Sequence, residues 1–303
     1  MFRTIVKIAA ILSFLTSHPL SKNRKLKVIG SFVRWQIGER ILKNKVIFPW
    51  VDESRFITGR GETGLTGNIY VGLMEYESMA FLLHTLRPTD VFVDVGANAG
   101  AYTILASKAV GARSVAFEPL PEAVGRLGDQ LRINGVESLV DVHAAGVGDR
   151  KTTLFFTKNN DTMNKVSVSG NDADKIEIDV TTLDDELDTN TSYFIKIDVE
   201  GFEHHVLEGA SRILSSGNVL AMIVELNGST EAFGHSNEEV HRKIGAFGFV
   251  PIAYDPETRT VRRLDGYNRN DGNTLYIRDE AAVSDRCKTA RPRVIHTAGG
   301  MAI

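Results

Sequence analysis

The stretch Val91-Phe92-Val93-Asp94-Val95-Gly96-Ala97-Asn98-Ala99-Gly100 decides the fold of this 303-residue chain. Residues 91–95 form a short, mostly apolar run, which is typical of a strand buried on both faces. Glycines follow at 96 and 100, and residues 102–110 then favour a helix. A buried strand, a glycine turn and a helix are the first half of a unit in which parallel strands are joined by crossover helices.

The alternation of strand and helix continues along the chain. Further strands are predicted at 114–117, 139–144, 193–198, 219–225, 249–254 and 273–277, and further helices at 75–87, 121–134, 202–214 and 238–247. The last two strands are joined by a polar loop, so the final one is predicted to be antiparallel. We therefore predict an α/β fold with a doubly wound, mostly parallel, Rossmann-like sheet of seven strands.

Three segments are predicted along the chain. Residues 1–70 form a basic, helical N-terminal extension, residues 71–281 form the catalytic domain, and residues 282–303 form a peripheral or disordered tail. Inside the catalytic domain, residues 152–157 and 175–180 alternate in polarity and predict an inserted antiparallel hairpin.

Composition excludes some classes of protein. The formal net charge of −3 and the pI of about 6.3 lack the basic excess of a nucleic-acid binder, so no nucleic-acid partner is expected. Cys287 is the single cysteine, which rules out an intrachain disulfide and fits a cytoplasmic location. No run approaches the roughly 20 apolar residues of a membrane span.

The N-terminus combines an apolar run in residues 1–15 with a basic stretch, Lys22–Lys27. No small-residue cleavage site follows, which disfavours a signal peptide. An amphipathic helix that packs on the domain or on a partner is the favoured interpretation. Peripheral membrane contact is the second, because Arg24, Lys25 and Lys27 could meet anionic lipid.

Asp94 lies at the end of the first predicted strand, and Glu118 follows the second. In doubly wound sheets, ligands bind beyond the carboxyl ends of the strands. The turn lacks the G-x-G-x-x-G spacing of dinucleotide sites, and Asp94 would oppose a pyrophosphate. A carboxylate there suits the ammonium and sulfonium of S-adenosyl-L-methionine, and Glu118 can accept hydrogen bonds from ribose hydroxyls. The predicted cofactor is therefore S-adenosyl-L-methionine.

These motifs, taken in order, resemble the FkbM-type methyltransferases. The resemblance rests on residues 93–103, Phe117-Glu118-Pro119, Asn134-Gly135, Thr182-Leu183-Asp184, residues 195–203, residues 206–210 and residues 223–225, and it spans about residues 70–280. It implies a class I methyltransferase fold and O-methylation of a hydroxyl on a sugar, glycan or secondary metabolite. The cofactor-binding residues expected from the motifs and the resemblance are Glu75, Asp94, Gly96, Asn98, Gly100, Tyr102, Glu118 and Pro119. Tyr70 is expected to join Glu75 in a lid.

Asp198 and Glu200 follow the fourth core strand, whose end opens onto the same crevice. A hydroxyl acceptor must lose a proton, so Asp198 is the first candidate for a base or orienting group, Glu200 the second and His204 the third. The alternative for both carboxylates is capping of the next helix. Glu225 could face the acceptor or pair with Lys196. Spacing does not demand a metal, and none is predicted.

Two other functions stay open at this level. One is an NAD(P)-dependent dehydrogenase on a similar sheet, which the missing glycine spacing disfavours. The other is a non-catalytic binding protein that keeps the fold. N-methylation is also open, and neither the acceptor nor the oligomeric state follows from the sequence.

Overall fold

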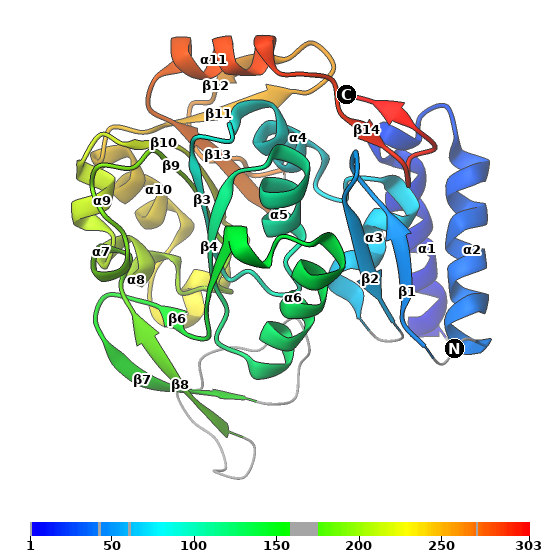
Figure 1. The fold of residues 1–303 in the computed structure, drawn as a ribbon, viewed down its shortest axis with the longest axis horizontal. Coiled ribbons are helices and arrows are strands. Elements are labelled where there is room, and N and C mark those ends of the chain that lie inside the picture. Colours follow the sequence, from blue (N-terminus) through cyan, green and yellow to red (C-terminus); the bar gives the residue numbers. More distant parts are fainter. Residues whose placement is uncertain (1, 42–43, 60–61, 158–174, 271) are drawn as a thin grey trace.

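The computed structural model describes residues 2–41, 44–59, 62–157, 175–270 and 272–303. An eight-stranded sheet lies at the centre of this described part, with helices on both faces (Figure 1). In spatial order its strands are β12 (Thr260–Arg263), β11 (Val250–Asp255), β13 (Asn273–Ile277), β10 (Val219–Glu225), β9 (Tyr193–Ile197), β3 (Val91–Val95), β4 (Arg113–Phe117) and β5 (Val140–His143). The predicted doubly wound α/β fold is confirmed.

The strands from β5 to β10 pair in parallel, and the predicted antiparallel final strand, β13, lies between β10 and β11. The sheet has one strand more than predicted. Strand β12 pairs with β11 in a region that is polar and was predicted to be a loop. Its exposed Arg262 and Arg263 suit a sheet edge, where charge discourages pairing with another chain. The same charged residues resemble those of a loop, so the strand was not recognised in the sequence.

Helices form a layer on each face of the sheet (Figure 1). One layer contains α4 (Tyr76–Thr85), α5 (Ala101–Ile104) and α6 (Pro121–Asn134), and the other contains α7 (Leu183–Glu186), α8 (Glu203–Glu208), α9 (Ser211–Ser215) and α10 (Asn237–Ala246). After α5 the chain continues as a π-helical stretch, Leu105–Val110. Side chains alternate across the sheet, so that Phe92 and Phe194 belong to one apolar cluster while Val93 and Ile195 belong to the other.

The predicted inserted hairpin is present as β7 (Thr152–Thr157) and β8 (Lys175–Thr181), which pair antiparallel. A short strand, β6 (Gly146–Val147), adds to β8 in parallel and completes a small three-stranded sheet. This sheet extends from the lower edge of the central sheet (Figure 1).

The N-terminal extension contains the helices α1 (Phe2–Ser17), α2 (Lys25–Ile41) and α3 (Thr63–Val71). It also contains a hairpin that was not predicted, β1 (Val46–Pro49) with β2 (Arg55–Thr58). Gln130 and Asn134 of α6 accept hydrogen bonds from the backbone of β2, at 2.9 and 2.8 Å. Within the described residues, no helix is both long and apolar enough to cross a membrane.

The C-terminal residues are folded, in contrast to the expected peripheral or disordered tail. They form α11 (Glu280–Thr289) and the strands β14 (Val294–Ile295) and β15 (Met301–Ala302), which pair antiparallel. Val283 and Cys287, one helical turn apart, are fully buried, as is Ile295. Few apolar residues anchor the C-terminal segment. Its polar composition therefore did not indicate helix α11, which packs on α4.

The ion pair between Arg286 of α11 and Asp90 supports a first prediction, because the Asp90 side chain is only 3% exposed. Arg286→Ala is expected to lower the free energy of unfolding by about 2–4 kcal/mol, since it leaves a buried carboxylate without its charge partner. Urea unfolding measures the change.

The control is Arg263→Ala, which breaks a second ion pair to α11. Both partners in that pair, Arg263 and Glu280, are well exposed, at 64% and 41%. Its cost is expected to stay below about 1 kcal/mol. Equal losses in the two variants would contradict the role of the Asp90 pair.

Candidate active site

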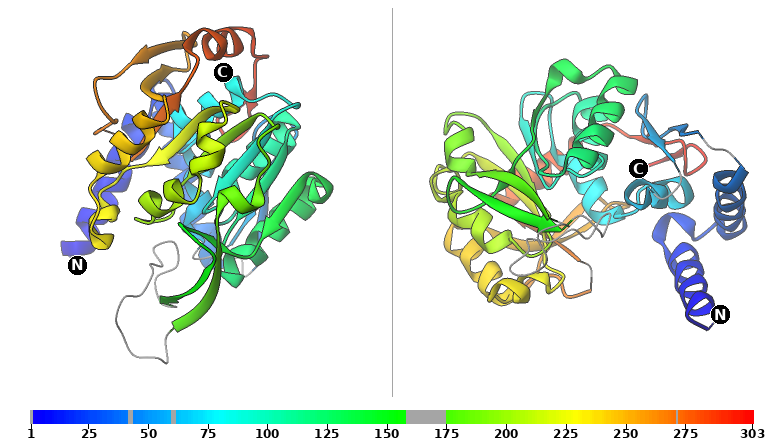
Figure 2. Two further views of the ribbon diagram at one scale, coloured as in Figure 1. Left: turned by 90° about the vertical axis from the view of Figure 1, so that its left-hand side faces the viewer. Right: turned by 90° about the horizontal axis from the view of Figure 1, so that it is seen from below.

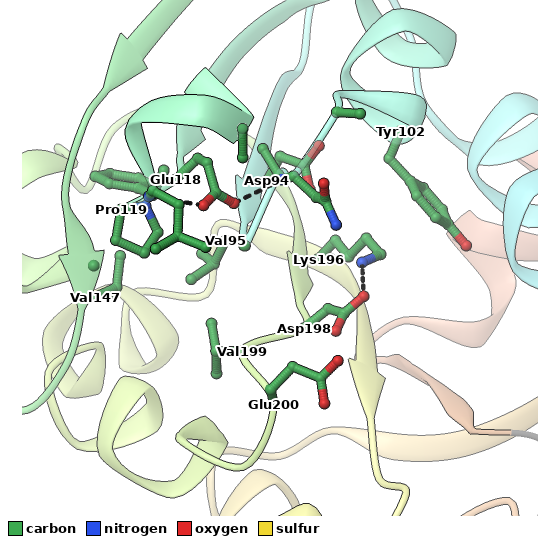
Figure 3. Close-up of a pocket in the computed structure, with 18 of the residues that line it drawn as sticks. Asp94, Val95, Tyr102, Glu118, Pro119, Val147, Lys196, Asp198, Val199 and Glu200 are labelled. Atoms are coloured by element: carbon green, nitrogen blue, oxygen red, sulfur yellow. Dashed lines mark hydrogen bonds and ion pairs between the residues drawn. The ribbon is translucent and has the colours of Figure 1, made fainter. Parts of the chain in front are cut away.

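A cavity of about 410 Å³ lies beyond the carboxyl ends of β3, β4 and β9, where a doubly wound sheet binds its ligands (Figure 3). The turns after these strands form its floor. The inserted sheet contributes apolar residues to one wall, Val147, Leu154, Ile178 and Val180. Leu65 and Met74 come from the N-terminal extension and the segment after it.

The turn after β3 requires glycine at position 96. Gly96 has φ +83°, and a Cβ there would collide with the carbonyl oxygen of Asp198. The backbone N–H groups of Gly96 and Ala97 both donate to the carbonyl of Phe117, at 3.0 Å. The three turns are thus packed directly against each other.

Gly100 lies outside the cavity lining. It precedes α5 with φ +81°, and a Cβ there would collide with Leu127 of α6. The structure therefore explains this glycine by helix packing, whereas we had predicted a cofactor contact.

Glu118 ties the first two turns together (Figure 3). Its Oε2 accepts the Asn98 backbone N–H at 2.8 Å, and its Oε1 accepts the Leu120 N–H at 2.9 Å. Asn98 itself is in the left-handed region, with φ +48°. Burial raises the pKa of Glu118, and the two N–H donors and Arg126 oppose that rise. The carboxylate is thereby held rigidly at the edge of the cavity.

Asp94 is buried at the end of β3 and accepts a hydrogen bond from the Thr103 hydroxyl at 2.6 Å. Burial raises the pKa of Asp94, while nearby Lys196 lowers it. The Lys196 ammonium donates to Asp198 at 2.6 Å and lies 4.9 Å from the centre of the Tyr102 ring. Although burial opposes its charge, Asp198, Asp94 and Glu75 together raise the pKa of Lys196 above its usual value. Lys196 is therefore a buried cation shared among carboxylates.

Asp198, Glu200 and Glu225 bring carboxylate oxygens to within 4.8 Å of one another. Burial and the neighbouring Asp198 raise the pKa of Glu225 to about 9. Burial alone would also raise the pKa of Asp198, but the ion pair with Lys196 outweighs it and lowers that pKa. At neutral pH, Glu225 thus carries a proton and Asp198 is ionised. The Asp198 side chain is 29% exposed, so a ligand in the cavity can reach it.

Glu203, which is not among the predicted site residues, shapes the turn that carries Asp198 and Glu200. Its side chain is fully buried, and its Oε1 accepts the N–H groups of Gly201 at 3.1 Å and Val199 at 3.3 Å. Glu200 adopts φ +53°, an uncommon backbone conformation for a residue other than glycine. Helix α8 starts at Glu203. An acidic residue in the first turn of a helix is the feature of the sequence that could have indicated this role. Asp198 and Glu200, in contrast, line the cavity.

The opposite wall contains Glu75 and Tyr102. The Tyr102 hydroxyl donates to Glu75 Oε2 at 2.6 Å, and the Asn273 amide donates to the same oxygen at 2.6 Å. Pro119 also lines the cavity, as expected, whereas Tyr70 does not and instead packs against Phe32. Asn273 is a functional neighbour that sequence reasoning missed, because 198 positions separate it from Glu75.

His204 does not line the cavity. Its ring stacks on His235, with centroids 3.7 Å apart, and the neighbouring His205 stacks on Phe202 at 4.1 Å. Neither imidazole lines the cavity. We therefore assign His204 no role at the cavity, although we had considered it as a base.

Comparisons with known proteins identify one sequence family. A sequence profile described as the methyltransferase FkbM domain matches residues 94–251, just over half of the chain. No curated protein sequence shows a significant match.

Solved structures with a similar fold include an rRNA methylase from Streptococcus thermophilus, with 16% identity and a TM-score of 0.35 over 66% of this chain and 91% of that one. Precorrin-6y C5,15-methyltransferase from Geobacter metallireducens shows 16% identity and a TM-score of 0.39 over 73% of this chain and 92% of that one.

Burial raises the pKa of Glu203 to about 7, from an ordinary value of 4.5, and this predicts a pH-dependent stability. The folded protein binds this proton more tightly than the unfolded chain does. The resulting stabilisation is complete below pH 4.5 and is lost as the pH rises through about 7, a change of about 3 kcal/mol. In Glu203→Gln the part of this slope due to Glu203 is expected to be lost from urea unfolding measured across that pH range, whereas the part due to Glu225, whose pKa is also raised, remains.

Glu208→Gln is the matched control, because Glu208 lies on the same helix but is exposed, and its pKa is lowered. This variant should keep the wild-type decline between the two pH limits. An unchanged decline in Glu203→Gln would show that another group causes it.

Proposed function

Because this chain belongs to the FkbM-domain methyltransferase family, we propose that it transfers a methyl group from S-adenosyl-L-methionine to a hydroxyl of a sugar, glycan or secondary metabolite. The observation that carries the proposal is one cavity that brings together a rigid, buried Glu118 and an ionised, reachable Asp198, which follow the two parallel strands on either side of β3. The first carboxylate suits cofactor binding, and the second suits handling of the acceptor.

The chemistry of the donor set fits this cofactor. Each oxygen of Glu118 accepts one backbone N–H, which leaves lone pairs for the two ribose hydroxyls. Apolar residues beside it, Phe117, Leu120 and Ala123, can pack against an adenine ring. Asp94 supplies negative charge near the cationic groups, where a pyrophosphate would be repelled. When bound, the cofactor supplies an electrophilic methyl group on its sulfonium.

Asp198 performs the acceptor chemistry in this proposal. An ionised carboxylate can accept a hydrogen bond from the acceptor hydroxyl, orient its oxygen and take up its proton during transfer. Lys196 keeps Asp198 ionised and fixes its position through the 2.6 Å contact. Glu225, protonated at neutral pH, adds no negative charge of its own beside Asp198. A proton acceptor supports O-methylation over methylation of a neutral amine, which does not need to lose its proton first.

Cofactor binding tests the first half of the proposal. Calorimetric titration of wild type is expected to show binding of S-adenosyl-L-methionine and S-adenosylhomocysteine but not of NAD. Glu118→Ala removes the ribose acceptor and should weaken adenosyl binding about 10- to 100-fold, the range for a hydrogen bond to a charged group.

Glu122→Ala is the control for cofactor binding, since Glu122 is exposed in the first turn of α6. It should bind as wild type does. Preferential binding of NAD would overturn the proposal in favour of a dehydrogenase. A folded wild-type protein that binds neither adenosyl compound would overturn it in favour of a binding protein.

Asp198→Asn tests the second half. The variant keeps the shape of the side chain but cannot accept the proton, so methyl transfer to a responsive acceptor should fall about 10²- to 10⁴-fold. Transfer of labelled methyl to free sugars, nucleotide-linked sugars and phenolic compounds measures this loss. Titration with S-adenosylhomocysteine should give a dissociation constant close to that of wild type. Undiminished transfer would exclude Asp198 as the proton acceptor.

A further inference from the structure

Helix α2 carries apolar side chains on two opposite faces. On the inner face, Val28 and Trp35 are buried, and Trp35 rests edge-on against Phe48 with ring centroids 5.5 Å apart. The outer face exposes four large apolar residues instead of the polar residues usual for a surface helix, namely Leu26 (86%), Val33 (47%), Ile37 (52%) and Ile41 (71%).

We call these four residues the α2 stripe. At 100° per residue they fall within an arc of about 80°, so they form one continuous line along the helix. Exposed Gly30 lies in the same arc, and nothing lies within 4 Å of the Cβ position there. Figures 1 and 2 show α2 at the periphery of the molecule, on the side away from the central sheet. The described part of the chain therefore leaves this face open.

Positive charge surrounds the α2 stripe. Residues 1–45 contain ten lysines and arginines and a single acidic residue, Glu39, although the whole chain has a net charge of −3. Lys25, Lys27, Arg34 and Arg40 are all exposed on α2. On a helical projection Lys27 and Arg34 border one side of the stripe, and Lys25 and Arg40 lie on the other.

Arg24 does not join this basic surface, in contrast to the expectation from the sequence. Its guanidinium donates to the carbonyl oxygens of Leu20 at 2.7 Å and Val71 at 3.0 Å, which holds it against the body of the protein.

We propose that the α2 stripe and its four flanking cations dock this protein on the surface of an anionic lipid bilayer. An apolar line bordered by lysine and arginine is the pattern of a helix that lies in the plane of the interface. The apolar side chains would enter the acyl boundary, while the long basic side chains extend to the lipid phosphates. The charge pattern thus matches an anionic surface.

A second copy of the chain fits this face less well. Two stripes placed together would bring the basic borders of both helices into proximity, and within residues 1–45 Glu39 alone offers a compensating charge. Like charges brought together at an interface oppose association.

Vesicle flotation of the full chain tests the proposal, with vesicles of phosphatidylcholine alone and of phosphatidylcholine mixed with phosphatidylglycerol. Wild type is expected to float with the mixed vesicles, to remain largely unbound with pure phosphatidylcholine, and to bind more weakly as salt is raised. The variant Ile37→Asp/Ile41→Asp should bind the mixed vesicles at least about tenfold more weakly, because it places charge in the apolar line. Both positions are exposed, so the thermal unfolding midpoint should stay close to that of wild type.

The matched control is Phe155→Ser on β7, which is 49% exposed and lies on the opposite side of the molecule (Figure 1). It should float as wild type does. Absence of wild-type flotation, or equal flotation of the Ile37→Asp/Ile41→Asp variant, would overturn the proposal. A wild-type dimer in sedimentation equilibrium that the same double substitution dissociates would assign the face to a second copy instead.

Discussion

The close packing of Gly96 against the carbonyl oxygen of Asp198 is the constraint on which the site depends. Strands β3 and β9 are neighbours in register, with Val95 opposite Ile197, so both chains turn at the same level of the sheet. The Asp198 N–H donates to the carbonyl of Val95 at 3.0 Å, and no side chain fits between the two turns. This contact places the carboxylates that suit the cofactor and those that suit the acceptor around one cavity.

Electrostatic interactions set the protonation states of the side chains around that cavity. Lys196 is the buried cation, and Asp94, Asp198 and Glu75 all stabilise its charge. A buried charge without partners would be strongly unfavourable, so removal of any one of these carboxylates makes the charge of Lys196 less stable. The opposite pKa shifts of Asp198 and Glu225 follow from their positions: Asp198 contacts the ammonium directly, whereas Glu225 contacts Asp198.

Segments outside the central sheet complete the site. The inserted sheet supplies apolar wall residues such as Leu154, and the N-terminal extension supplies Leu65. Glu75 accepts hydrogen bonds from Tyr102 of α5 and from Asn273 of β13. The extension therefore has two surfaces with separate roles: its inner side borders the cavity, while the outer side of α2 presents the apolar and basic surface proposed for lipid.

The sequence alone determined the alternation of the parallel strands with helices, the antiparallel final strand and the placement of Asp94, Glu118 and Asp198 at strand ends, because apolar periodicity and glycine turns are local properties of the chain. Tertiary structure decided the rest. It folded the polar tail into α11, assigned Gly100 to packing against Leu127 and directed His204 onto His235. It also brought Glu75 into contact with Asn273 and raised the pKa of Glu225, so that this side chain is protonated at neutral pH. These features depend on contacts and burial between residues far apart in the chain, which no local pattern encodes.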